Sequence, residues 1–96
     1  MNDRIITVQL EITGRVQGVG YRESMRAVAQ ALNVNGWVRN RGDGNVEGLV
    51  QGEPEDVERV IAWCHNGPPA AHVRFVKADP VAGGETFAEF TLRPSV

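Results

Sequence analysis

Three glycines and an arginine lie close together near the amino terminus, in the run Gly14-Arg15-Val16-Gln17-Gly18-Val19-Gly20-Tyr21-Arg22. The glycines allow the backbone to turn tightly and to direct successive N–H groups toward one point, and such a group of amides binds anions. Arg22 adds a planar, permanently charged fork that fits phosphate or carboxylate oxygens. The run therefore predicts an anion-binding loop. The alternative is a glycine-rich turn that binds nothing and has a basic residue beside it.

A strand pattern precedes this loop and a helix pattern follows it. Apolar and polar residues alternate from Ile6 to Ile12, as in a strand with one buried face. From about Arg22 to Leu32 the apolar residues recur at helical spacing. Because partial positive charge develops at the start of a helix, this junction favours an anion. The loop lacks the lysine–serine pair of a Walker motif and the spacing of a dinucleotide fingerprint, so a nucleotide site is not predicted.

Asn40 is the second residue whose side chain could take part in chemistry. It stands near the end of a predicted strand, just before the turn residues Gly42-Asp43-Gly44. A side chain at that position can reach a neighbouring loop, where its amide could hold a water molecule through both donor and acceptor. The alternative is an asparagine that caps its own hairpin turn.

The other reactive side chains do not form a recognisable catalytic set. His65 and His72 have no serine, cysteine or carboxylate at a spacing that suggests a catalytic pair, and the single cysteine, Cys64, falls on an apolar helix position. Neither a nucleophile–base pair nor a metal-ligand cluster can be assembled from the spacing. We therefore expect no metal and no cofactor. An enzyme of this kind would need a reactive substrate.

The remaining sequence predicts two strands, a helix and two further strands. The first helix ends at Asn33 and Asn35-Gly36. The later elements are a strand from Gly36 to Arg41, a strand from about Val46 to Gln51, a helix that Pro54 opens and Gly67-Pro68-Pro69 ends, a strand with Val73, Phe75 and Val76, and a short strand with Ala88, Phe90 and Leu92. Right-handed crossovers place both helices on one face of the sheet. The expected fold is an α+β ferredoxin-like two-layer sandwich, with a mainly antiparallel sheet and a short extra C-terminal strand.

Composition agrees with one small globular domain over residues 1–96. Apolar residues make up 42% of the chain and charged residues 23%, with a net charge of −2. An acidic balance argues against a general nucleic-acid surface. No apolar run approaches the roughly 20 residues of a membrane span, and the first residues lack the plan of a signal peptide. We expect a cytoplasmic protein, and we expect it to be a monomer.

Two segments of the chain resemble the signatures of the acylphosphatase family. The segment from Ile12 to Arg22 is similar to the first signature, and Gly36-Trp37-Val38-Arg39-Asn40, followed by Gly44, Val46 and Gly52, is similar to the second. The order of the predicted elements and the length of the chain match as well, so the resemblance covers essentially the whole chain. Tyr21 departs from the pattern, since the family more often has phenylalanine there. The aromatic ring is kept, and the open questions are its packing and the partner of its hydroxyl.

The resemblance implies hydrolysis of acyl phosphates to a carboxylate and inorganic phosphate, without metal or cofactor. It implies that Arg22 and Asn40 are the catalytic residues, with Arg22 binding the phosphoryl group and Asn40 positioning the attacking water. The residues implied to form the phosphate cradle are Arg15, Val16, Gln17, Gly18, Val19, Gly20, Tyr21 and Arg22. Two other functions remain open. One is a binding module with little turnover, like the corresponding domain of larger carbamoyl-transfer proteins. The other is an RNA-binding ferredoxin-like domain, which the acidic charge and the absence of an aromatic-rich strand motif disfavour.

Overall fold

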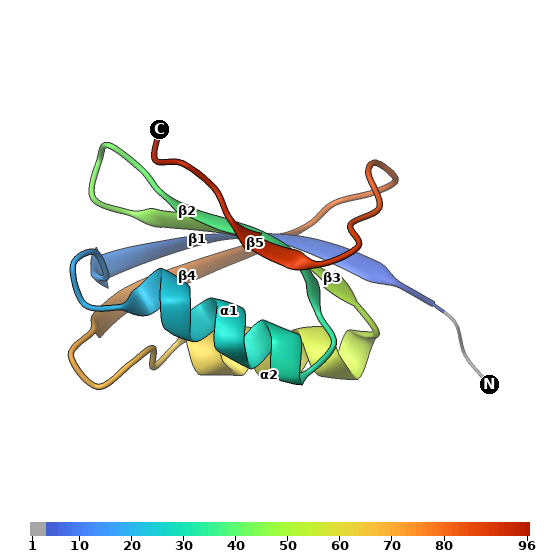
Figure 1. The fold of residues 1–96 in the computed structure, drawn as a ribbon, viewed down its shortest axis with the longest axis horizontal. Helices are drawn as coiled ribbons and strands as arrows, with labels where there is room; N and C mark the ends of the chain where they lie inside the picture. The colour runs from blue at the N-terminus through green and yellow to red at the C-terminus, as the bar shows by residue number, and fades with distance from the viewer. Residues whose placement is uncertain (1–3) are drawn as a thin grey trace.

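The predicted order of elements is confirmed in the structure, a computed structural model that describes residues 4–96. The elements are β1 (Ile6–Arg15), α1 (Tyr21–Ala31), β2 (Asn35–Asn40), β3 (Val46–Gly52), α2 (Pro54–Cys64), β4 (His72–Pro80) and β5 (Phe90–Leu92). Figure 1 shows both helices on the same face of the sheet, as right-handed crossovers require.

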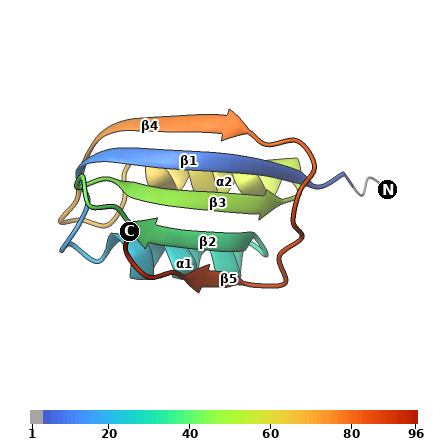
Figure 2. The ribbon, with the colours of Figure 1, turned by 90° about the horizontal axis from the view of Figure 1, so that it is seen from above.

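The five strands form one sheet in the order β4-β1-β3-β2-β5 (Figure 2). Neighbouring strands are antiparallel except β2 and β5, which are parallel. The ferredoxin-like sandwich is therefore confirmed, with β5 added as an edge strand beside β2. In the described part of the chain, neither helix is long and apolar enough to cross a membrane.

The core lies between the sheet and the two helices. Alternate residues of β1, namely Val8, Leu10 and Ile12, are buried against the helices. The residues between them, such as Gln9 and Glu11, lie on the other face of the sheet, which neither α1 nor α2 covers. This alternation decides which side chains of each strand can approach the start of α1.

The first strand is longer than predicted. It continues past Ile12 to Arg15, with a bulge between Thr13 and Gly14. Gly14 has φ +129°, and a Cβ atom there would overlap the carbonyl oxygen of His72 and approach the Arg74 nitrogen to 2.7 Å. Only glycine allows β4 to pair so closely, and the strand therefore reaches the loop itself.

Other boundaries also differ from the prediction. Helix α1 begins at Tyr21 and ends at Ala31, because Gly20 takes a left-handed conformation just before it and Leu32 already leaves helical geometry. Asn33, predicted to end the helix, follows the C-cap Leu32 and takes a left-handed conformation with φ 59°. Asn35-Gly36 does not end the helix but opens β2, which pairs with β3.

The last strand is shorter than predicted, but its pairing continues along β2. It starts at Phe90, so Ala88 lies outside it. Beyond the strand, Arg93 N–H donates to the Val38 carbonyl and Val96 N–H donates to the Asn40 carbonyl, at 2.9 and 3.1 Å. The C-terminal residues therefore support the end of β2.

Candidate active site

The predicted anion-binding loop has its backbone N–H groups unpaired. Gly18 and Gly20 have φ +75° and +82°, so the chain turns twice before α1. Gly20 is the N-cap of α1 and supplies no side-chain cap. Within residues 4–96, the N–H groups of residues 17–22 donate to no backbone or side-chain acceptor. The first amides of a helix always lack intrahelical partners, and here the preceding turn adds more of them.

A small pocket lies at this junction of loop, helix and sheet. Its volume is about 90 Å³, and its lining residues are Val16, Gly18, Gly20, Tyr21, Arg22, Glu23 and Asn40. Most of the loop positions named from the sequence thus lie around one space together with Asn40. Arg15, Gln17 and Val19 do not line it: Arg15 is exposed at the end of β1, and Val19 packs against the edge of the core.

Arg22 lies in the first turn of α1 and lines the pocket, partly exposed. In the described part of the chain its guanidinium forms no hydrogen bond and no ion pair. Its neighbour Glu23 is instead paired with Arg26, at 2.8 Å. The negative charge at the pocket rim therefore has a partner on its own helix, while the positive charge of Arg22 is free to meet an anion.

Asn40 faces the pocket because of its place at the end of β2. Residues alternate along the strand, so Asn40 points to the same side as the fully buried Val38, toward the helices. Its Oδ1 is buried, and among residues 4–96 it is the one buried side-chain nitrogen or oxygen atom without a hydrogen-bond partner. The hairpin turn is capped by Asp43, whose Oδ1 accepts from Asn45 N–H at 3.0 Å. The alternative of a turn-capping Asn40 is therefore wrong.

Tyr21 supports the floor of the pocket. Its ring is buried against Trp63, with centroids 5.2 Å apart, and its hydroxyl donates to the Cys64 carbonyl oxygen at 2.7 Å. A Cβ atom on Gly67, which has φ +67°, would lie 2.7 Å from Cε2 of this ring. The hydroxyl that distinguishes Tyr21 from phenylalanine is thus buried in the core with a hydrogen-bond partner.

Neither Tyr21 nor Cys64 can act as an ionised group near neutral pH. Burial raises the pKa of the Tyr21 hydroxyl far above its ordinary value, and the adjacent Cys64 adds to the rise. Burial also raises the pKa of the Cys64 thiol to about 12, although the Tyr21 hydroxyl lowers it somewhat. The prediction that Cys64 occupies a core position is confirmed, since its side chain is fully buried.

Gln17 has a role that the sequence did not suggest. Its side-chain Nε2 donates to the carbonyl oxygens of Arg41 and Asn45, at 2.8 and 2.9 Å. These two residues flank the turn that follows Asn40. A glutamine in a glycine-rich loop carries no local signal of such a contact, because the two segments are 24 and 28 residues apart.

Larger hollows lie elsewhere on the molecule. One of about 490 Å³ lies at the other end of β1, lined by residues 5–7, Gln51 and residues 80–86. There Gln51 Nε2 donates to Thr7 Oγ1 and to the Glu85 carbonyl, while Gln51 Oε1 accepts from Phe87 N–H. The side-chain amide in this hollow is thus fully hydrogen-bonded, unlike that of Asn40. Nowhere in residues 4–96 do three or more histidine, cysteine or acidic side chains form a group that could hold a metal ion.

The chain is similar in sequence and in fold to known proteins. A family model described as Acylphosphatase matches residues 8–92. The chain is 54% identical over 77 residues to an acylphosphatase of Thiobacillus denitrificans, covering 80% of this chain and 86% of the relative. It is 48% identical over 93 residues to an acylphosphatase of Acaryochloris marina, covering 97% and 100%. The solved structure of an acylphosphatase from Coxiella burnetii matches with a TM-score of 0.88 and 34% identity, covering 93% of each chain. The chain belongs to the acylphosphatase family.

Proposed function

We propose that the chain hydrolyses the carboxyl–phosphate bond of acyl phosphates in the pocket between the loop, α1 and β2. One observation carries the proposal. An unpartnered arginine and a buried, unpartnered amide oxygen face the same space, Arg22 from the start of α1 and Asn40 from the end of β2. A buried acceptor without a partner is costly, and a water molecule would satisfy Asn40 Oδ1, while a bound anion would pair with the Arg22 guanidinium.

The phosphoryl group is held by the loop and by Arg22. The amides of residues 17–22 and the positive end of the helix dipole stabilise its oxygens, and the Arg22 guanidinium binds two of them at once. The proposed cradle spans Arg15 to Arg22, with Arg15 adding positive field from the end of β1. These donors are in place before the substrate arrives, so the charge that develops in the transition state meets an arrangement that needs no reorganisation.

The attacking water is held by Asn40. Its Oδ1 accepts a hydrogen bond from the water, which leaves an oxygen lone pair free to attack phosphorus in line with the departing carboxylate. A new P–O bond forms to water while the P–O bond to the acyl group breaks. The carboxylate is a good leaving group and needs no protein acid, and the phosphate of the substrate takes the water's proton. The side chains of the pocket then act by positioning and by charge alone.

At about 90 Å³ the pocket matches the size of a phosphoryl group, and the acyl group of the substrate would lie at or beyond its mouth. The test is turnover of benzoyl phosphate beside phenyl phosphate, which has a similar ring but a much poorer leaving group. We expect phosphate release from benzoyl phosphate and at least a hundredfold less from phenyl phosphate, because phenolate leaves much less readily than benzoate. A hundredfold difference in rate corresponds to about 2.7 kcal/mol in barrier height. Comparable rates on both would mean that a proton donor has been overlooked.

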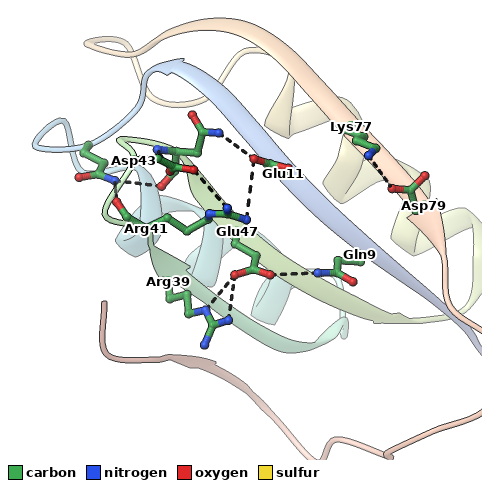
Figure 3. Close-up of polar contacts among 10 residues, drawn as sticks. Gln9, Glu11, Arg39, Arg41, Asp43, Glu47, Lys77 and Asp79 are labelled. Carbon is green, nitrogen blue, oxygen red and sulfur yellow. Dashed lines mark hydrogen bonds and ion pairs between the residues drawn. The ribbon is translucent and has the colours of Figure 1, made fainter. Parts of the chain in front are cut away.

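We further propose that the chain acts as a cytoplasmic monomer with no cofactor and no nucleic-acid partner. Two arginines on the uncovered face of the sheet are paired with acidic side chains: Arg39 lies 2.9 Å from Glu47 and Arg41 lies 3.1 Å from Asp43 (Figure 3). Paired charges of both signs make a poor surface for a phosphate backbone. Activity should persist in EDTA. A loss of activity in EDTA that added magnesium restores would contradict the proposal that no metal is needed.

A further inference from the structure

We propose that the side chain of Gln17 is a positioning residue: it fixes Asn40, on the β2–β3 hairpin, at the correct distance from the phosphate cradle. This inference deepens the proposed function and rests on it. It assigns to the Gln17 amide a role distinct from that of its backbone N–H, which belongs to the cradle.

The two functional groups of the pocket come from parts of the fold that are built separately. The cradle lies between β1 and α1, whereas Asn40 is the last residue of β2. Hydrolysis requires the water on Asn40 and the phosphorus in the cradle to be aligned, and a misplacement of about 1 Å can cost a factor of about 10² in rate. A contact that joins the two segments directly is therefore valuable.

Gln17 provides such a contact. One NH₂ group donates to two carbonyl oxygens, that of Arg41 at 2.8 Å and that of Asn45 at 2.9 Å. Both hydrogens of the amide are used, so the side chain has one favoured orientation. Among the described residues, no other side-chain hydrogen bond joins residues 16–20 to residues 40–45.

The two carbonyls are well placed to control Asn40. Arg41 directly follows Asn40, and its N–H donates to the Asn45 carbonyl at 2.8 Å, closing the mouth of the hairpin. Gln17 therefore binds both sides of the hairpin, at the two residues that flank its turn.

The hairpin is also anchored to the sheet through its side chains. Asn45 Nδ2 donates to Glu11 Oε2 on β1 at 2.7 Å, and Arg41 lies 3.8 Å from the same carboxylate. Figure 3 shows Arg41, Asp43 and Glu11 gathered beside the hairpin on the uncovered face. With its backbone carbonyls held by Gln17 and its side chains by Glu11, the hairpin has little freedom to move Asn40 away from the pocket.

The test compares Gln17→Met with the wild type. Methionine keeps the length and approximate shape of the side chain but removes both donors. We expect kcat on benzoyl phosphate to fall about tenfold or more, because the water is no longer aligned with phosphorus. The inhibition constant of inorganic phosphate should change by less than about threefold, since Arg22 and the loop amides remain.

A double-mutant cycle separates this role from a general effect on the loop. If Gln17 acts through Asn40, then adding Gln17→Met to Asn40→Ala should change kcat by less than about twofold, because there is no longer an amide to position. Full multiplication of the two losses, together with weaker phosphate binding, would show that Gln17 only shapes the cradle and would overturn the proposal. An unchanged kcat in Gln17→Met would overturn it as well.

Gln51→Met is the matched control. Gln51 also uses its amide to tie a loop to the sheet, but at the far end of β1, and it makes three hydrogen bonds. We expect it to lower Tm at least as much as Gln17→Met while kcat stays within about twofold. An equal loss of kcat in this control would show that lost stability, and not lost positioning, explains the Gln17 result.

Two further outcomes keep the inference distinct from the proposed function. If Gln17→Met does not fold, Gln17→Asn retains the amide on a side chain one methylene too short to reach both carbonyls, and the same readouts apply. If Asn40→Ala leaves kcat unchanged, the water-positioning role fails and the Gln17 role fails with it. If Asn40→Ala lowers kcat and the Gln17 variants do not, only the Gln17 role fails.

Discussion

The two ends of β1 differ in how they use hydrogen-bonding groups. At the Ile6 end a hollow of about 490 Å³ contains Gln51, whose amide makes three hydrogen bonds. At the Arg15 end a pocket of about 90 Å³ contains Asn40, whose Oδ1 is buried without a partner in residues 4–96. In the larger hollow the side-chain amide is already hydrogen-bonded, whereas in the smaller pocket donors and an acceptor remain unpaired.

On the proposed assignment of the active site to the smaller pocket, the size of a cavity is a poor guide to function in so small a fold. Buried polar groups are nearly always paired, so an unpaired one marks a place where something else must bind. The loop end has several unpaired groups around one pocket: the N–H groups of Gly18, Gly20, Tyr21 and Arg22, the Arg22 guanidinium and the buried Asn40 Oδ1. At the far end, the Gln51 amide instead holds the β4–β5 loop in place through hydrogen bonds to Glu85 and Phe87.

Asn40→Ala should give the largest effect. We expect kcat to fall by about 10² or more, as when one positioned donor is removed elsewhere, while phosphate binding is largely kept. The free energy of unfolding should stay within about 1 kcal/mol of the wild type, because the deleted oxygen has no partner to lose. Steady-state kinetics and thermal unfolding check both parts. Collapse of phosphate affinity with kcat preserved would reverse the assignment of roles.

Arg22→Lys should give the next largest effect. The charge remains but the fork is lost, and lysine cannot contact two phosphoryl oxygens at once. A lost charge-assisted hydrogen bond is worth roughly 1.5–3 kcal/mol, so kcat/KM should fall at least about tenfold. Folding should be unaffected, because the side chain forms no ion pair or hydrogen bond in the described part of the chain. Near-native kcat/KM in a folded variant would show that positive potential alone suffices.

Tyr21→Phe sharpens the comparison by separating support of the pocket from chemistry in it. The change removes the hydroxyl that donates to the Cys64 carbonyl at 2.7 Å. We expect the free energy of unfolding to fall by about 1 kcal/mol and Tm by about 4–8 °C. Since burial keeps this hydroxyl protonated, kcat/KM should change by less than about twofold. A tenfold loss of activity would mean that the hydroxyl takes part in the reaction.

Ala82→Leu should give the smallest effect. Ala82 is exposed and lines the hollow at the far end of the molecule, so leucine would partly fill that space. We expect kcat/KM on benzoyl phosphate to stay within about twofold, because the residues that line this hollow are not among those that line the pocket. A clear loss of activity would show that the far hollow binds part of the substrate.

The sequence allowed much of the fold to be predicted because its patterns are local. Alternation of apolar residues predicted β1, and helical spacing predicted α1. The right-handed crossover rule then predicted that both helices lie on one face of the sheet. The boundaries at Gly14 and Asn35 were missed because long-range pairing with β4 and β3 decides them. The parallel pairing of β5 with β2 was missed for the same reason, since three residues carry no signal of their partner.

The candidate site shows the same limit. The positions of Arg22 and Asn40 could be predicted from their motifs, because each residue lies at the end of an element that its own neighbours specify. The bond from Gln17 to the hairpin could not be predicted, nor could the partner of the Tyr21 hydroxyl. Both contacts join segments far apart in the chain, and a polar side chain gives no local sign of which distant carbonyl it will find.

The central claim is that the unpaired groups at the Arg15 end of β1 bind the phosphoryl group. The most direct measurement is an NMR titration of the ¹⁵N-labelled protein with inorganic phosphate, following the backbone amides. We expect the largest shifts at residues 17–22 and at the Asn40 side-chain amide, saturating with one affinity, and almost none at residues 81–86. Shifts that centre on residues 81–86, or that are spread evenly without saturation, would contradict the account.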